Sequence, residues 1–134
     1  MLTQIEQRLC DAAISARHNA YAPYSKFKVG AAILDEFDNI HLGVNVENAA
    51  YPQGSCAEAG AISAMIASGG TKIKRIAVSG AGTQLCTPCG GCRQRIREFA
   101  SLKTDILICT DSQFKKRFNL EMLLPASFGP DNLV

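Results

Sequence analysis

The sequence contains no tryptophan, only three tyrosines and no long hydrophobic run. A membrane-spanning helix needs about 20 consecutive apolar residues, and no stretch of this chain approaches that length. The N-terminus lacks the basic region, apolar core and cleavage site of a secretory signal. We therefore expect a cytoplasmic protein that has no membrane partner.

The chain also lacks a large excess of either charge, since 14 Lys and Arg nearly balance 12 Asp and Glu and leave a formal net charge of +2. Lys115, Lys116 and Arg117 form a basic run, which is typical of a solvent-exposed face. A nucleotide or polynucleotide substrate would require converging basic residues or stacking aromatic side chains. The chain shows neither, so we expect no nucleic-acid partner.

What remains is the composition of an ordinary folded domain, with 47% hydrophobic and 19% charged residues. A chain of 134 residues is long enough to bury one core and too short for two. The sequence has no internal repeat and no linker. We therefore expect residues 1–134 to form a single domain.

Hydrophobic spacing and turn residues predict eight secondary-structure elements. They are a helix to about residue 18, strands at 27–34 and 40–46, a helix at 55–68, a strand at 73–78, a helix from Pro88, a strand at 105–109 and a short helix near 118–124. Capping boxes of Thr3 with Glu6 and of Ser55 with Glu58 mark the starts of the first two helices. A hairpin followed by helical crossovers predicts a three-layer α/β/α sandwich with a mixed β-sheet.

Six cysteines occur, at positions 10, 56, 86, 89, 92 and 109. Cys10 and Cys109 lie in apolar segments and are expected to be small buried hydrophobic residues. In a cytoplasmic protein, closely spaced thiols favour metal binding or catalysis over disulfides. The other four cysteines are therefore the candidates for chemistry.

Candidate zinc ligands open two of the predicted helices, with Cys56 in one and with Cys89 and Cys92 in the other. Free backbone amides and the helix dipole favour thiolates at such positions. Three protein ligands leave one tetrahedral position of zinc open for water, as in catalytic sites. Glu58 lies two residues after Cys56. This position favours a catalytic role for Glu58 beside the metal.

Other interpretations of these residues stay open. Cys86, Cys89 and Cys92 form two overlapping C-x-x-C pairs, so together with Cys56 they could close a structural zinc site in a non-catalytic interaction module. Glu58 could serve only in a capping box. A thioredoxin-like redox role for the C-x-x-C would leave Cys56 and Glu58 without a function.

Two motifs, C-A-E at 56–58 and P-C-G-G-C at 88–92, resemble the signature of the zinc deaminases, which combine three His or Cys ligands with a non-ligand Glu. Further motifs resemble the small homotetrameric cytidine deaminases in the same order: YSKFKVGAA at 24–32, GVNVENAAY at 43–51, CRQ at 92–94, LLP at 123–125 and FGP at 128–130. The resemblance spans residues 21–133.

The resemblance implies zinc-dependent hydrolytic deamination of free cytidine and 2′-deoxycytidine to uridine and 2′-deoxyuridine plus ammonia, a step of pyrimidine salvage. It implies one zinc per chain, held by Cys56, Cys89 and Cys92. Zinc would activate the attacking water. Glu58 would carry protons from that water to N3 of the ring and to the departing ammonia. A nucleoside antibiotic stays open as an alternative substrate.

The resemblance also implies a nucleoside pocket. Phe27 would stack near the base, although it could instead pack in the core, and backbone groups around Ala57 would recognise the pyrimidine edge. Asn45 and Glu47 would hold the ribose 3′-hydroxyl. These two residues lie two apart, so on a strand their side chains would point to the same face and converge.

Tyr51 and Phe128 match positions that, in the tetrameric family, reach into a neighbouring subunit's site, so we expect a homotetramer with shared active sites. One residue departs from the pattern. Many three-cysteine relatives carry Arg directly after the catalytic Glu, where it offsets the thiolate charge, but this chain has Ala59. We expect Arg93, next to Cys92, and the helix N-termini to compensate.

Overall fold

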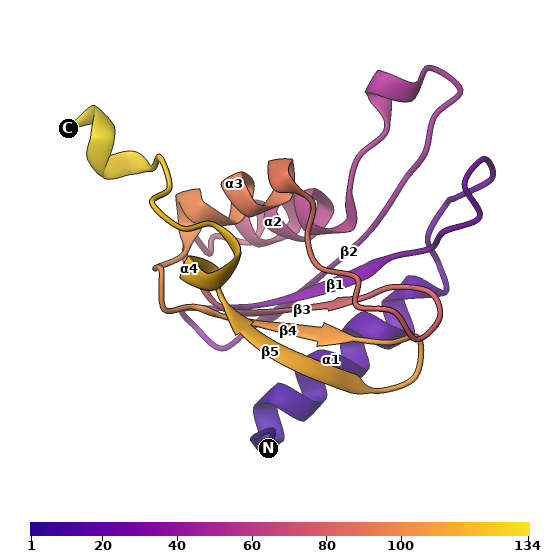
Figure 1. The fold of residues 1–134 in the computed structure, drawn as a ribbon, viewed down its shortest axis with the longest axis horizontal. Helices are drawn as coiled ribbons and strands as arrows, with labels where there is room; N and C mark the ends of the chain where they lie inside the picture. The colour runs from indigo at the N-terminus through magenta and orange to yellow at the C-terminus, as the bar shows by residue number, and fades with distance from the viewer.

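A mixed five-stranded β-sheet forms the centre of the computed structural model, which describes residues 1–134 (Figure 1). The strands are β1 (Gly30–Asp35), β2 (Ile40–Val44), β3 (Ile73–Ser79), β4 (Asp105–Cys109) and β5 (Phe114–Asn119). Their order across the sheet is β2-β1-β3-β4-β5, and β3 and β4 are the one parallel pair.

Helices cover both faces of this sheet. Helix α1 (Gln4–Arg17) lies on one face, whereas α2 (Ala57–Ala67) and α3 (Gly90–Phe99) lie on the other, with the short α4 (Leu120–Leu123) beside α3 (Figure 1). Single 3₁₀ turns occur at Tyr51–Gln53 and Pro130–Leu133. The three-layer α/β/α sandwich with a mixed sheet is thereby confirmed. None of the helices has the length and hydrophobicity that crossing a membrane requires.

Side chains of the central strands alternate between two hydrophobic cores, because successive residues of a strand face opposite sides. Ala31 and Ile33 of β1 pack in the core beneath α2 and α3. Ala32 and Leu34 pack against α1. Cys10 and Cys109 are fully buried in this second core, as their apolar surroundings predicted.

Helix α2 approaches strand β2 so closely that no side chain fits between them. A Cβ atom on Gly43 would lie 2.1 Å from the carbonyl oxygen of Ala57 and 2.2 Å from the amide nitrogen of Ala61. Distances below 3.0 Å do not occur for real Cβ atoms. The glycine therefore allows the first turn of α2 to lie directly on β2, which fixes where that helix begins.

The structure differs from the sequence-based elements near the C-terminus. Residues 114–119 form the edge strand β5, which the sequence did not predict, and the helix expected near 118–124 is reduced to α4. Charged side chains at Lys115, Lys116 and Arg117 interrupt any apolar alternation. Charged residues are common on edge strands because they oppose pairing with another chain.

Arg117 is more than part of a solvated face, because it helps to bind α1 to the sheet. The carboxylate of Glu6 accepts hydrogen bonds from Arg75 of β3 at 2.9 Å and from two nitrogens of Arg117 at 2.8 and 2.9 Å. The Glu6 side chain is 3% exposed. The hydrogen bonds from Arg117 lower the pKa of Glu6 to about 2. Thr3 completes the predicted capping box with Glu6.

We predict that Glu6→Gln lowers the free energy of unfolding at pH 7 by about 1 to 3 kcal/mol, because Arg75 loses its anionic partner and Arg117 keeps only Asp105. The pKa of Glu6 is lower in the folded protein, at about 2, than its ordinary 4.5. The stabilisation is therefore complete above pH 4.5 and disappears as the pH falls towards 2. Urea unfolding of both proteins at pH 7, 4 and 2.5 measures this change.

The matched control is Glu121→Gln, which removes an exposed carboxylate with no ion-pair partner. It is expected to unfold like the parent protein at each pH. A stability difference between Glu6→Gln and the parent that stays constant across this pH range would contradict the assigned role of the carboxylate.

Candidate active site

Two helix N-termini carry the candidate ligands. Cys56 is the N-cap of α2, Cys89 is the N-cap of α3, and Cys92 lies in the first turn of α3. Free backbone amides at a helix N-terminus stabilise anionic groups. The cysteines that were expected at the starts of two helices therefore lie there, although the helices begin slightly later than predicted.

Two details of those helix starts were predicted wrongly. Because Cys56 rather than Ser55 is the N-cap of α2, the capping box of Ser55 with Glu58 does not form. Glu58 is the second helical residue, one position too early for such a box. Pro88 was expected at the first helical position, but α3 begins at Gly90 because Cys89 takes the cap.

The sulfur atoms of Cys56, Cys89 and Cys92 all lie within 4.8 Å of one another. Tetrahedral zinc with Zn–S bonds of about 2.3 Å places its sulfurs about 3.8 Å apart, so this donor set fits zinc. Cys86 is not part of the cluster. The residues present thus supply three thiolates and leave one tetrahedral position open, which disfavours the closed four-thiolate site.

Burial dominates the electrostatics of this cluster. Burial raises the pKa of Cys56 and of Cys92, whereas the nearby backbone N–H of Cys92 lowers the pKa of Cys89. A bound divalent cation reverses the effect of burial, because a coordinating thiol loses its proton. The arrangement is therefore suited to a metal rather than to a free reactive thiol.

Glu58 faces the same cavity as Cys56 and Cys89 and is 4% exposed. The cavity has a volume of about 160 Å³ and is lined by Val29, Asn45, Cys56, Ala57, Glu58 and Cys89. Burial raises the pKa of Glu58. A buried carboxyl group with a raised pKa binds a proton more readily than an exposed one, as a general acid and base requires.

Asn45 and Glu47 do not lie on a strand, as their predicted convergence required, because β2 ends at Val44. Asn45 lines the cavity beside the cysteines, and its side chain bonds the amide of Val29 and the carbonyl of Phe27. Both side chains nevertheless reach the loop that precedes β1.

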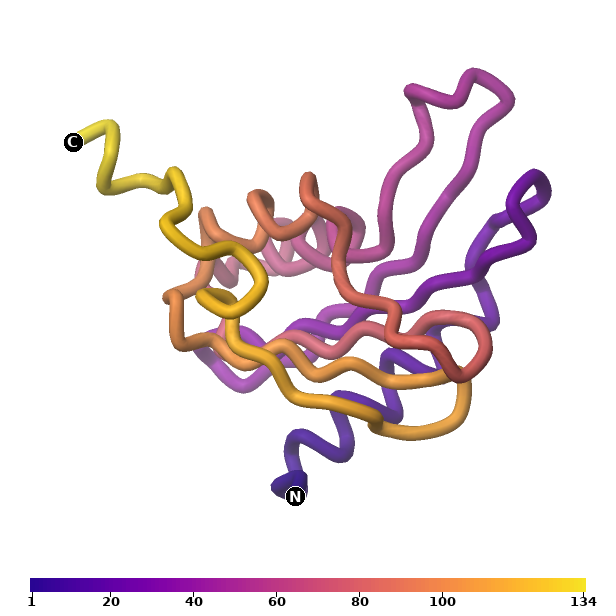
Figure 2. The backbone as a smooth tube through the Cα atoms, viewed as in Figure 1, coloured from indigo at the N-terminus to yellow at the C-terminus, as the bar shows by residue number.

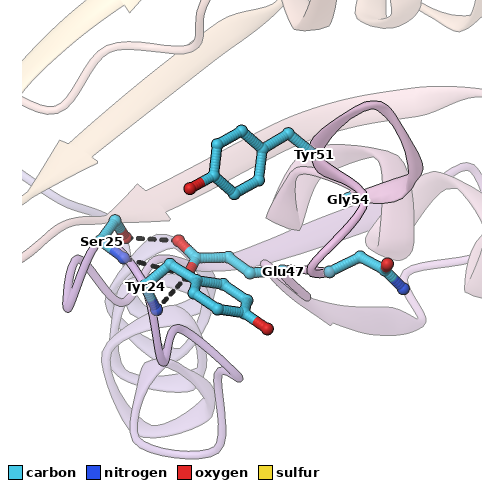
Figure 3. Close-up of a pocket in the computed structure, with 6 residues that line it drawn as sticks. Tyr24, Ser25, Glu47, Tyr51 and Gly54 are labelled. Atoms are coloured by element: carbon cyan, nitrogen blue, oxygen red, sulfur yellow. Dashed lines mark hydrogen bonds between the residues drawn. The ribbon is translucent and has the colours of Figure 1, made fainter.

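Glu47 lies in a second cavity of about 400 Å³, which is lined by Tyr24, Ser25, Glu47, Asn48, Tyr51 and Gly54 (Figure 3). Its carboxylate accepts hydrogen bonds from the amides of Tyr24 and Ser25 and from the Ser25 hydroxyl. That hydroxyl also lowers the pKa of Glu47. Tyr24 and Ser25 belong to the YSKFKVGAA motif at 24–32, but the sequence predicted no role for them.

The remaining aromatic candidates are exposed in the single chain. Phe27 is 44%, Tyr51 77% and Phe128 57% exposed, so Phe27 is not a core residue. Tyr51 lies in the loop that follows β2, and Phe128 lies in the C-terminal arm, and both segments project from the body of the domain (Figures 1 and 2). None of the three lines the cavity beside the cysteines.

Arg93 makes other contacts than the sequence suggested. Its guanidinium donates to the carbonyl oxygens of Pro88 and Leu123 and to the hydroxyl of Thr87, and it makes no hydrogen bond to sulfur. Arg93 thus holds the segment before Cys89 against the end of α4. The guanidinium that contacts a sulfur belongs to Arg95, which sequence reasoning missed.

The fold and the site together define a class of protein: an α/β/α domain in which three cysteines at two helix N-termini could hold a metal ion, with a buried carboxyl group close by. Comparison with known proteins identifies the family. Residues 3–108 match the family described as "Cytidine and deoxycytidylate deaminase zinc-binding region". The chain belongs to this family.

Individual relatives agree over most of the chain. A cytidine deaminase of Sporosarcina psychrophila is 37% identical over 118 residues, which make up 88% of this chain and 87% of the relative. One from Halalkalibacterium halodurans is 34% identical over 127 residues, 95% of this chain and 96% of the relative. The crystal structure of cytidine deaminase from Burkholderia pseudomallei has a TM-score of 0.85 and 35% identity, and the match covers 95% of this chain and 100% of that one.

We predict that Cys89→Ala lowers the zinc content well below one ion per chain, because a ligand is lost. Cys86→Ala should keep one zinc ion, since its sulfur lies outside the cluster. Metal analysis of both purified variants, with folding checked by circular dichroism, measures the difference. Equal loss of zinc in the two variants would contradict the three-cysteine site and restore the four-thiolate alternative.

Proposed function

We propose that this chain catalyses the zinc-dependent hydrolytic deamination of free cytidine and 2′-deoxycytidine to uridine and 2′-deoxyuridine plus ammonia, as a cytoplasmic enzyme of pyrimidine salvage. The observation that carries the proposal is the gathering of three sulfurs within 4.8 Å, with the buried Glu58 facing the same cavity. The names of the relatives support the choice of substrate.

Cys56, Cys89 and Cys92 would hold zinc, which when bound polarises a water molecule for attack on C4 of the cytosine ring. Glu58 then serves as the proton carrier. Its carboxylate takes a proton from the water and delivers it to N3 of the ring, then takes the remaining proton of the hydroxyl added at C4 and passes it to the departing amine. Burial raises the pKa of Glu58, which favours the protonated form that the carboxyl group takes between its proton transfers.

The base would lie at the start of α2. The backbone around Ala57, the first residue of that helix, offers free N–H groups towards the cavity beside the metal, suited to the pyrimidine edge. Phe27 would stack near the base. Its exposed ring supports this role better than core packing.

Glu47 and Asn45 would hold the ribose 3′-hydroxyl. An ionised carboxylate has about four acceptor positions, and Glu47 uses three of them on the loop of Tyr24 and Ser25. One position is thus available for a substrate hydroxyl. Asn45 likewise makes one donor and one acceptor bond and keeps a second N–H free.

We further propose a homotetramer whose subunits share active sites. In the single chain, large apolar side chains are exposed on the two projecting segments, which makes these segments suited to association. Tyr51 and Phe128 lie on them and would reach a neighbouring site. Sedimentation of the zinc-loaded protein tests the assembly, and a monomer would contradict it.

The decisive test of the proposed function is Glu58→Gln. The variant should keep one zinc ion per chain, since Glu58 is not a ligand, and should lose deamination of cytidine by about 100-fold or more because the proton carrier is removed. Glu98→Gln, an exposed change on α3, is the matched control and should match the parent. Zinc loss in Glu58→Gln would place that residue among the ligands and overturn the assignment.

The sugar contacts predict a pattern of substrate preference. Cytidine and 2′-deoxycytidine should differ in kcat/KM by less than about tenfold, since no side chain is assigned to the 2′-hydroxyl. A 3′-deoxy analogue should be worse by about tenfold or more, because Glu47 and Asn45 lose a partner. Glu47→Ala should remove much of that discrimination. Steady-state kinetics that show equal turnover of the 3′-deoxy analogue by the parent enzyme would contradict these contacts.

A further inference from the structure

The proposed zinc site concentrates negative charge. Zinc with three thiolates carries a formal charge of −1, and Glu58 adds a carboxyl group to the same cavity. Electron-rich sulfurs weaken the ability of the metal to polarise water, and hydrogen bonds to the ligands adjust this effect. A positive group in contact with a sulfur would therefore strengthen the site on which the proposed function rests.

Two positions near the ligands do not provide that contact. Position 59, directly after Glu58, is an alanine. Arg93 directs its guanidinium to Pro88, Thr87 and Leu123, away from the sulfurs.

Arg95 does provide it. This residue lies on α3 three positions after Cys92, so the two share one helix face. Long side chains on a helix lean towards its N-terminus, which here directs the guanidinium of Arg95 back to the ligand. Its Nη1 donates to the sulfur of Cys92 at 3.7 Å, and Arg95 forms no ion pair with a carboxylate.

The first turn of α3 leaves room for this guanidinium. A Cβ atom on Gly91 would lie 3.2 Å from Nη1 of Arg95, which is tighter than an ordinary contact. A Cβ atom on the neighbouring Gly90 would have no atom within 4 Å. The two glycines of the P-C-G-G-C motif thus differ: Gly91 borders the arginine, whereas Gly90 faces open space.

We propose that Arg95 is a positioning residue that balances the charge of the three-thiolate site through its hydrogen bond to Cys92. The bond withdraws electron density from the sulfur and so favours polarisation of the water by the bound metal. Gly91 keeps the path of the guanidinium open. Arg95 acts through Cys92 and does not line the cavity beside the cysteines.

The experiment replaces zinc by Co²⁺, whose sulfur-to-metal charge-transfer band reports the electron density of the thiolates. In Arg95→Leu the near-ultraviolet band should move to longer wavelength, because a sulfur without its hydrogen bond donates more readily. The zinc form should keep one ion per chain, and its kcat for cytidine should fall about tenfold with KM changed by less than about twofold. Arg8→Gln, an exposed arginine change on α1, is the control and should alter none of these quantities.

Three further variants separate the charge contact from a general effect on the helix. Arg95→Lys keeps the charge and a donor, so it should restore part of the band position and of kcat. Gly91→Ala should shift the band in the same direction as Arg95→Leu, because the guanidinium is displaced. Gly90→Ala makes the same chemical change one residue earlier and should leave the band in place.

The outcomes distinguish this inference from the proposed function. If the parent protein shows no thiolate band with Co²⁺, or no deamination with zinc, the proposed function itself fails. If the parent shows both, and Arg95→Leu leaves the band and kcat unchanged, then only the role of Arg95 is overturned. A band shift in Gly90→Ala equal to that in Gly91→Ala would also overturn it.

Discussion

The backbone contact between α2 and β2 at Gly43 is the constraint on which the site depends. Because the carbonyl of Ala57 and the amide of Ala61 lie where a side chain would otherwise be, the first turn of α2 has one possible position on the sheet. Cys56 directly precedes that turn and Glu58 lies within it. Helix α3 packs beside α2, which brings Cys89 and Cys92 to the same place. The ligands are thus located by main-chain packing.

Burial and metal binding have opposite effects on the ionisation of the groups at this site. Burial raises the pKa values of Glu58, Cys56 and Cys92, which favours their neutral forms. Zinc binding requires the thiolates to be anionic. The positive ends of two helices and the guanidinium of Arg95 beside Cys92 act against the cost of burial, as a bound metal would. At Glu58 burial outweighs the favourable charge of Arg95, so the pKa of that carboxyl group stays raised.

Much of the fold could be predicted from sequence, because the strands β1, β3 and β4 are short apolar runs and the first helix has a complete capping box. β5 could not be predicted in this way. Its stability comes from pairing with β4, while its own residues are largely charged or half-exposed. The local sequence pattern predicts a strand poorly where pairing with a neighbouring strand provides its stability.

The clustering of Cys56, Cys89 and Cys92 could be predicted because their residue type and spacing are those of a metal site. The finer contacts could not. The hydrogen bond from Arg95 to Cys92 depends on which way a long side chain turns on α3, and spacing along the sequence does not decide this. The bonds of Glu47 depend on the path of a loop more than 20 residues earlier in the chain. Helix boundaries and loop paths are set by tertiary packing, which a single sequence does not display.

The carboxylate of Glu6 has a consequence for how the chain is made. Its partners Arg75 and Arg117 follow it by 69 and 111 residues, and α1 packs on strands as late as β4. Helix α1 therefore leaves the ribosome well before either arginine, and the second arginine is synthesised 111 residues after Glu6. Until those later strands emerge, the helix stays undocked with its apolar face uncovered, so this part of the domain closes late.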